Sequence, residues 1–137
     1  MKKDITIFII DDDEDDKKLF VESAKEVDKN INCVTASDGQ EAIRFLKDEH
    51  NTLPDYIFLD LRMPRINGKQ CLEEIRKDKR LYHIPVFIYT TSRDVEESAE
   101  LKKMGAVHFI SKPDNPRDIY YILSVVLDEK WDQIERI

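Results

Sequence analysis

The sequence has few of the residues on which several common protein classes depend. Among its 137 residues there are only three glycines, two cysteines and three histidines. Gly39, Gly68 and Gly105 lie far apart, which excludes a glycine-rich phosphate loop and argues against a nucleotide or flavin cofactor. Cys33 and Cys71 form neither a disulfide framework nor a metal knuckle, so two reduced, buried thiols are the simpler interpretation.

Long apolar runs are also missing. The longest run near the N-terminus, Ile5 to Ile10, contains Thr6 and is followed directly by acidic residues. It is too short for a signal sequence and falls far below the ~20 residues of a membrane span. We therefore expect a cytoplasmic protein without a membrane partner.

Negative charge is concentrated in one place. The formal net charge is −7, from 22 basic and 29 acidic residues. The acids from Asp11 to Asp16 are consecutive, and without this run the acidic and basic residues nearly balance. This distribution favours a local cation site and argues against nucleic acid as a partner.

Short β-branched segments alternate with segments of helical periodicity along the chain. Near-continuous apolar runs predict strands at 5–10, 32–36, 56–59, 86–90 and 107–110. Helical patterns lie between and after them, at about 14–28, 38–49, 67–79, 93–104 and 115–127. Five such units predict a doubly wound α/β fold, with one parallel sheet covered by helices on both faces. We expect one domain over residues 1–127, followed by a helical extension or tail at 128–137.

Polar residues follow four of the predicted strands. In such sheets ligands bind beyond the carboxyl ends of the strands, where Asp11, Asp12, Asp60, Thr90 and Lys112 would converge. Carboxylates that lie close together repel, and a divalent cation with oxygen ligands relieves the repulsion; magnesium suits such a site. A metal, an amine and a hydroxyl around one carboxylate are suited to phosphoryl transfer, with the carboxylate itself as nucleophile.

Five segments in a fixed order strengthen this interpretation. They are Ile9-Ile10-Asp11-Asp12, Leu59-Asp60-Leu61-Arg62-Met63-Pro64 with Asn67-Gly68, Val86-Phe87-Ile88-Tyr89-Thr90-Thr91, Met104-Gly105-Ala106 and Phe109-Ile110-Ser111-Lys112-Pro113. Together they cover nearly the whole chain and resemble the receiver domain of two-component response regulators. The resemblance implies a flavodoxin-like sheet with strand order 2-1-3-4-5. It also implies a stand-alone signalling domain that catalyses only its own phosphorylation and dephosphorylation.

The resemblance assigns roles to the strand-end residues. Asp60 would accept a phosphoryl group from the phosphohistidine of a sensor histidine kinase. Asp12 and Asp60 would bind Mg²⁺ directly, together with the backbone carbonyl of Arg62, whereas Asp11 would act mainly through water. Lys112 would contact the phosphoryl group. The Thr-Thr-Ser sequence at residues 90–92 resembles single-domain receivers paired with phytochrome-type kinases.

The same resemblance implies a switch and a cis peptide bond. Thr90 would move toward the phosphoryl group, and the aromatic Phe109 would follow, so that the face of the fourth helix, fifth strand and fifth helix changes shape. The family often has tyrosine at the position of Phe109, and phenylalanine lacks that hydroxyl. The Lys112–Pro113 bond is expected to be cis.

The last predicted helix suggests a partner surface. If the helix ran from residue 116 to about 135, it would be roughly 30 Å long and exceed a typical strand. One apolar stripe on it would contain Tyr120, Leu123, Leu127 and Trp131. We expect this stripe to form a homodimer contact or to bind an unidentified downstream protein.

Two other functions fit part of the pattern. Asp11-Asp12-Asp13 contains the Asp-x-Asp of haloacid-dehalogenase-type phosphatases, in which Asp11 would be the nucleophile. A pseudo-receiver, which uses the fold only as a binding scaffold, is the other alternative. Asp13 to Asp16 are interpreted as a solvated helix start, favoured by the helix dipole.

Overall fold

Five strands alternate with five helices in a computed structural model that describes residues 4–130. The strands are β1 (Thr6–Ile10), β2 (Asn32–Ala36), β3 (Tyr56–Leu59), β4 (Val86–Thr90) and β5 (His108–Ser111). The helices are α1 (Glu14–Val27), α2 (Gly39–Lys47), α3 (Gly68–Lys77), α4 (Val95–Lys103) and α5 (Arg117–Leu127). The sequence predicted every one of these elements; β5 lies one residue later than expected.

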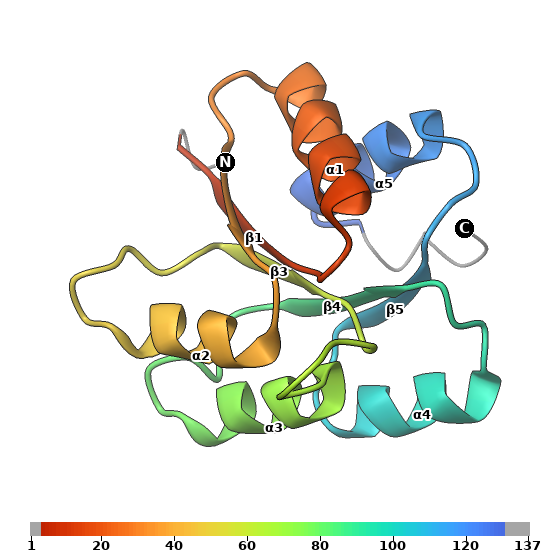
Figure 1. The fold of residues 1–137 in the computed structure, drawn as a ribbon. Coiled ribbons are helices and arrows are strands. Elements are labelled where there is room, and N and C mark those ends of the chain that lie inside the picture. The colour runs from red at the N-terminus through yellow and green to blue at the C-terminus, as the bar shows by residue number, and fades with distance from the viewer. Residues whose placement is uncertain (1–3, 131–137) are drawn as a thin grey trace.

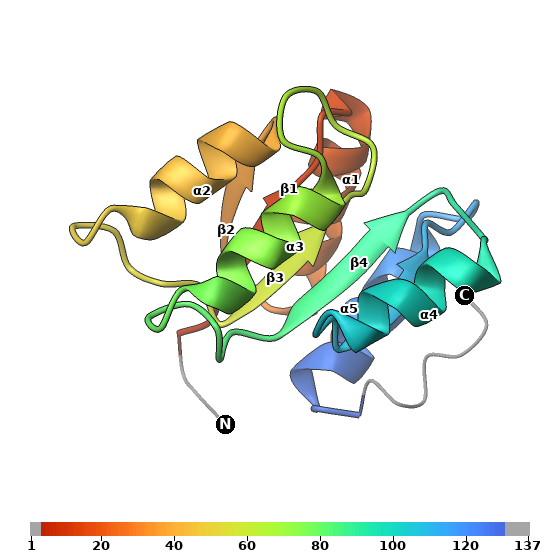
Figure 2. The same cartoon turned by 90° about the horizontal axis from the view of Figure 1, so that it is seen from below.

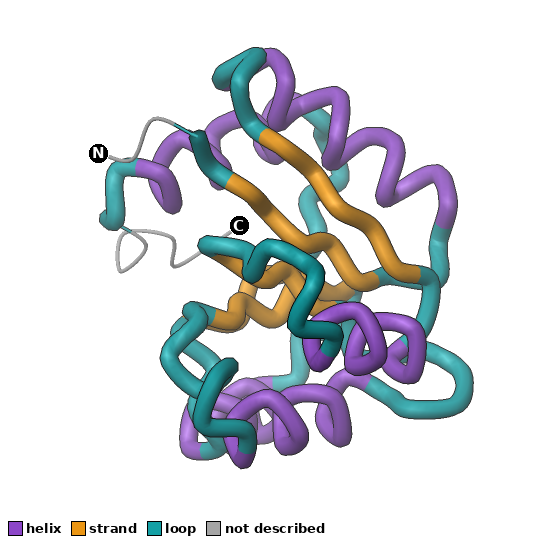
Figure 3. Tube along the Cα trace, turned by 90° about the vertical axis from the view of Figure 1, so that its left-hand side faces the viewer, coloured by secondary structure: helices purple, strands orange, loops and turns teal. Residues whose placement is uncertain are grey.

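The strands form one parallel sheet in the order β2-β1-β3-β4-β5. Helices α1 and α5 cover one face, and α2, α3 and α4 cover the other (Figures 1 and 2). Viewed from the side, the twisted sheet lies between these two layers of helices (Figure 3). The doubly wound α/β fold is therefore confirmed. Within residues 4–130 no helix has the length and apolar character needed to cross a membrane.

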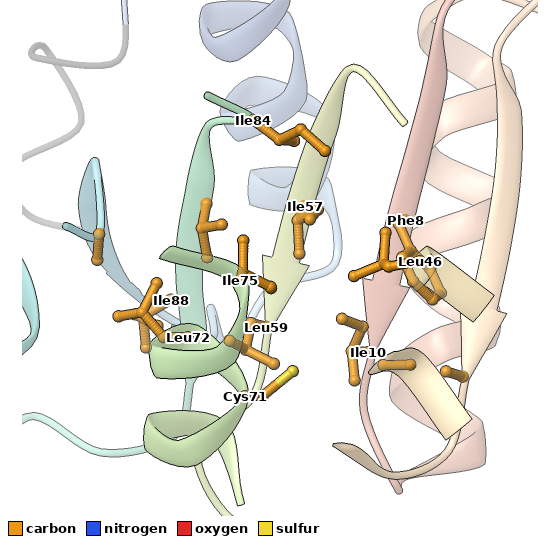
Figure 4. Packing of buried hydrophobic residues seen from close by; sticks show 14 of the residues in the cluster. Phe8, Ile10, Leu46, Ile57, Leu59, Cys71, Leu72, Ile75, Ile84 and Ile88 are labelled. Carbon is orange, nitrogen blue, oxygen red and sulfur yellow. The ribbon is translucent and has the colours of Figure 1, made fainter. Parts of the chain in front are cut away.

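Alternate residues of each strand pack into different cores. Phe8 and Ile10 of β1 contact the aliphatic core under α2 and α3, where Leu46 and Leu72 are fully buried (Figure 4). Ile9 of β1 points to the opposite face. Because both faces are covered, every second position is as apolar as its neighbour, which explains the continuous apolar runs in the sequence. Full burial of each such side chain contributes about 1.5–3 kcal/mol.

The core under α1 and α5 is rich in aromatic rings. Phe20 of α1 lies 4.8 Å from Phe58 and 5.7 Å from Tyr89, measured between ring centroids. Phe58 also stacks on Phe87 at 5.1 Å. Tyr89 stands next to the last residue of β4, so this aromatic cluster continues from the core to the carboxyl end of the sheet.

Helix α5 ends where the helical pattern over residues 115–127 predicts. Asn115 lies just before α5, and its side-chain oxygen accepts a hydrogen bond from Arg117 N at 3.0 Å. The helix ends at Leu127, and Glu129 has a positive φ of 58°. This left-handed conformation cannot continue an α-helix, so α5 does not run on without a break toward residue 135. Residues 131–137 lie outside the described part of the chain.

Helix α4 has the smallest buried face. Of its nine residues, all of which the structure describes, only Leu101 is buried. Helix α3 has almost the same length and buries Cys71, Leu72 and Ile75 along its inner face. Less buried apolar surface means a smaller free energy for local opening.

We expect amide hydrogens of residues 95–103 to exchange with solvent about tenfold or more faster than those of residues 68–77, because α4 loses fewer buried side chains when it opens. Hydrogen–deuterium exchange with mass spectrometry measures both segments in one experiment, and α3 is the internal control. Equal protection of the two helices would contradict the prediction.

Candidate functional site

The backbone holds the strand-end residues in place. The N–H of Asp60 donates to Ile10 O at 2.9 Å, and the N–H of Lys112 donates to Thr90 O at 2.7 Å. Asp11 likewise donates a backbone hydrogen bond to the end of β2. The ladder thus continues past the strand ends, and the predicted residues converge on one edge of the sheet.

Lys112 is the single cation of this cluster among the contacts described. Its Nζ lies 2.7 Å from Asp11 Oδ2, 2.7 Å from Asp16 Oδ2 and 3.5 Å from Asp60 Oδ2. The side chain is only 9% exposed. Burial by itself would lower the pKa of Lys112, but the contacts with Asp11 and Asp16 outweigh it and hold the pKa above its ordinary value. Lys112 is therefore charged at neutral pH.

Asp11 is fully buried. Its Oδ1 accepts a hydrogen bond from Asp13 N at 2.9 Å. Its Oδ2 makes the ion pair with Lys112 but has no well-aligned hydrogen bond. Desolvation raises the pKa of Asp11 to about 6, and the nearby charge of Asp60 acts in the same direction.

Three carboxylates are close enough to share a cation. One oxygen each from Asp11, Asp12 and Asp60 lies within 4.8 Å of the other two, and Asp12 is exposed at the rim. Asp11 Oδ2 has the Lys112 ammonium beside it but no well-aligned hydrogen bond, so this buried oxygen can also serve as a ligand of a hard cation. These residues therefore fit a divalent cation. The role of the Arg62 carbonyl stays a prediction.

A glycine allows the loop after β3 to fold back over the site. A Cβ atom on Gly68 would lie 2.3 Å from the carbonyl oxygen of Asp60 and 2.7 Å from Leu61 Cα. The Gly68 N–H instead donates to Leu61 O at 3.0 Å. The Leu61 N–H in turn donates to Asp60 Oδ1 at 2.8 Å, which orients the carboxylate.

The predicted switch residues stand on neighbouring strands. Thr90 of β4 is fully buried, and its Oγ1 accepts a long hydrogen bond of 3.5 Å from Ser92 N. Phe109 of β5 is partly buried against the aliphatic core. Their role as a switch remains a prediction.

The rim of the site is linked to α4 through Glu97. Ser92 Oγ donates to Glu97 Oε1 at 2.8 Å, and the guanidinium of Arg62 lies 3.9 Å from the same oxygen. The Arg62 side chain is 70% exposed and extends from the loop after β3 toward α4. Polar contacts thus supplement the small apolar face of this helix.

Two expectations from the sequence are not met. The described residues contain no cis peptide bond, so the predicted cis Lys112–Pro113 bond is wrong; X–Pro bonds favour trans by about 0.5–1 kcal/mol unless tertiary contacts select cis. In the predicted partner stripe, Leu123 and Leu127 are buried in the protein's own core, because they face the sheet. Tyr120 is exposed, and Trp131 lies outside the described residues.

Sequence reasoning missed Asp16. It was interpreted as part of a solvated helix start, but its carboxylate contacts Lys112. No signal in the local sequence distinguishes it from Asp15, because both acids lie in the first turn of α1.

The sequence profile of the response regulator receiver domain matches residues 7–124. The chain belongs to this family. It is a response regulator receiver domain whose acidic cluster of Asp11, Asp12 and Asp60 is typical of the family's phosphorylation site. Such receivers are signalling domains and not classical enzymes. The match does not support the phosphatase interpretation with Asp11 as nucleophile.

Relatives and solved structures agree with this assignment. The receiver is 32% identical over 115 residues to the probable C4-dicarboxylate response regulator DctR of Bacillus subtilis, covering 82% of this chain and 47% of DctR. It is 27% identical over 118 residues to the response regulator Rcp1 of Synechocystis, covering 83% and 80% of the two chains.

A crystal structure of the phosphorylated cyanobacterial phytochrome response regulator RcpA superposes with a TM-score of 0.83, at 28% identity and 97% coverage of both chains. The chain spans less than half the length of DctR and of a similar transcriptional regulator, ycf27 of Guillardia theta. The relatives include both longer regulators and the short Rcp1, of which this chain covers most of the length.

The raised pKa of Asp11 predicts a pH-dependent stability. Its pKa is about 6 in the folded protein and 3.8 ordinarily, so folding favours the protonated form and the free energy of unfolding falls as pH rises from about 4 to 6. The shift corresponds to at most about 3 kcal/mol. Asp11→Asn removes this loss, while Lys112 keeps Asp16 and Asp60 as partners.

We therefore expect the variant to gain stability relative to wild type, by up to about 3 kcal/mol, between pH 4 and pH 7. Urea unfolding in chelator-treated buffer measures the difference at each pH. A difference that does not change with pH would contradict the assignment of the raised pKa to Asp11.

Proposed function

We propose that this receiver accepts a phosphoryl group on Asp60 from the phosphohistidine of a sensor histidine kinase, in a reaction that requires Mg²⁺. The observation that carries the proposal is the position of Asp60 between the cation-binding carboxylates and the buried ammonium of Lys112. The phosphorylated RcpA structure, at 28% identity, supports it. As with other receivers, we expect the reaction to take place in the cytoplasm.

The residues divide the chemistry among them. An oxygen of Asp60 attacks phosphorus; the P–N bond of the phosphohistidine breaks as the P–O bond forms, and the imidazole leaves with its electron pair. Lys112 lies 3.5 Å from Asp60 Oδ2, within reach of oxygens on the transferred group. Asp12, Asp60 and the backbone carbonyl of Arg62 would hold Mg²⁺ directly and Asp11 would hold it through water; the ion would neutralise charge on those oxygens. Positioning and charge compensation are the protein's whole contribution.

The decisive test is intact mass after incubation with acetyl phosphate and Mg²⁺. Wild-type protein should gain one labile phosphoryl group, and Asp60→Asn should gain none, because the nucleophile is lost. Asp15→Asn is the matched control: it removes an exposed carboxylate from the first turn of α1, and it should gain one group like wild type.

Other results identify the alternatives. Phosphorylation that survives in Asp60→Asn but is lost in Asp11→Asn would indicate the phosphatase-type nucleophile. Wild-type protein that gains no phosphoryl group from acetyl phosphate or from a histidine kinase would be a pseudo-receiver.

Phosphorylation would then change the surface through Thr90. The new group adds about −1.5 to −2 charges to a cluster that is already acidic. Thr90 has only a 3.5 Å hydrogen bond to give up when its hydroxyl turns toward the phosphoryl oxygens. Phe109 is partly buried on β5 opposite Ile88, two residues before Thr90, and it can move toward the space that Thr90 leaves. Moving such a two-state surface from 1:99 to 99:1 requires about 5.5 kcal/mol of differential stabilisation.

A homodimer or downstream-partner contact through α5 is part of the proposal. Tyr120 and Tyr121 are 45% and 47% exposed on the outer face of α5. Exposed aromatic side chains of this kind are common anchors of protein–protein contacts. The contact is narrower than the stripe predicted from sequence, because the leucines of that stripe face inward.

The switch and the contact are tested together by sedimentation velocity with beryllofluoride and Mg²⁺. Beryllofluoride should raise the dimer association constant of wild-type protein. In Thr90→Ala this increase should be at least about tenfold smaller, because the hydroxyl that would contact the phosphoryl group is gone. Thr91→Ala, an exposed neighbour, is the control. A wild-type monomer at all concentrations removes the homodimer; an unchanged response in Thr90→Ala removes the proposed switch.

A further inference from the structure

We infer that Asp16 is a positioning residue that competes with the phosphoryl group for Lys112. This inference rests on the proposed function of Asp60. Lys112 Nζ lies 2.7 Å from Asp16 Oδ2 and 3.5 Å from Asp60 Oδ2, so the ammonium is closer to the helix carboxylate than to the phosphoacceptor. The contact with Asp16 is also a hydrogen bond between residues 96 positions apart.

The start of α1 determines where the Asp16 carboxylate lies. Asp13 is the N-cap, and its Oδ1 accepts a hydrogen bond from Asp16 N at 3.0 Å, which fixes the backbone of Asp16 in the first turn. The helix dipole stabilises a negative charge there. The Asp16 side chain is partly buried, with 34% of it exposed, whereas the neighbouring Asp15 lies on the open surface. Of these two consecutive acids, only Asp16 is directed toward the site.

The surroundings of Lys112 strengthen this pair. The Lys112 side chain is 9% exposed, and its Nζ lies 5.9 Å from the centre of the buried Tyr89 ring. An ammonium with an aromatic ring on one side and little water around it interacts more strongly with a carboxylate than it would on an open surface. Asp16 therefore holds Lys112 more firmly than an exposed ion pair would.

The competition follows from the position of the ammonium among its partners. Lys112 contacts three carboxylates, those of Asp11, Asp16 and Asp60. Because Lys112 Nζ lies closer to Asp16 than to Asp60, a move toward a phosphoryl group on Asp60 would lengthen its contact with Asp16. The Asp16 charge also repels the incoming dianion. Both effects act in the same direction, so Asp16 lowers the affinity of the site for a phosphoryl group. Binding of that group in turn weakens the Asp16–Lys112 contact, which links α1 to the end of β5.

The test measures the affinity of the full chain for beryllofluoride in the presence of Mg²⁺ by isothermal titration calorimetry. Asp16→Asn removes the charge with almost no change in size, and it should bind beryllofluoride about tenfold more tightly than wild type. Asp15→Asn removes a similar charge from the same helix turn without the contact to Lys112, and its affinity should stay within about twofold of wild type. Asp16→Glu, which keeps a carboxylate, should return the affinity toward that of wild type.

A purely structural role for Asp16 cannot produce this result, because a destabilised site binds more weakly. Equal or weaker binding by Asp16→Asn overturns the inference, as does equal tightening by Asp15→Asn. Failure of the proposed function has a different signature: wild type and Asp16→Asn would both fail to bind beryllofluoride, and neither would be phosphorylated on Asp60.

Discussion

One ammonium group, that of Lys112, lies among carboxylates that would otherwise repel one another. Asp11 comes from the end of β1, Asp60 from the end of β3 and Asp16 from the first turn of α1. Two carboxylates about 4 Å apart repel by about 4 kcal/mol at an effective dielectric constant near 20, and water provides little screening where Asp11 is fully buried. A buried charge without a partner is strongly destabilising. The carboxyl end of the sheet therefore depends on Lys112, and any added charge must redistribute its contacts.

The two cores give the opposite faces of the sheet different properties. The face under α2 and α3 is mainly aliphatic, with Phe8 as the one fully buried aromatic side chain among its described residues, whereas the face under α1 and α5 contains the packed rings of Phe20, Phe58 and Phe87. Tyr89 extends this aromatic group to Lys112, so one side of the site is packed directly against the core. On the other side, α4 is attached by Leu101 and by polar contacts at the rim. We therefore expect a change in charge at the site to displace α4 more easily than the aromatic core under α1 and α5.

The order and type of the secondary-structure elements could be predicted because each depends on local pattern. Strands covered on both faces are continuously apolar, and helices begin at Asp13, Asp38, Asn67 and Asp94, whose side chains cap the first turn. The pattern did not decide whether α5 stops at Leu127 or runs on, because this depends on the left-handed conformation of Glu129, a residue type that ordinarily continues a helix. The inward orientation of Leu123 was missed for a related reason: on a helix that is apolar around most of its surface, the pattern does not show which side meets the sheet.

The sequence by itself determined the alternating α/β architecture and the residues that follow each strand, since periodicity and position along the chain are properties of neighbouring residues. In a parallel sheet these strand ends must meet at one edge, so Asp11, Asp60 and Lys112 were recognised without coordinates. Only the tertiary structure decided which acid of a run of six reaches Lys112. That choice depends on how α1 packs against the sheet, and an acid on the wrong side of the same helix turn has an identical local pattern but points into water.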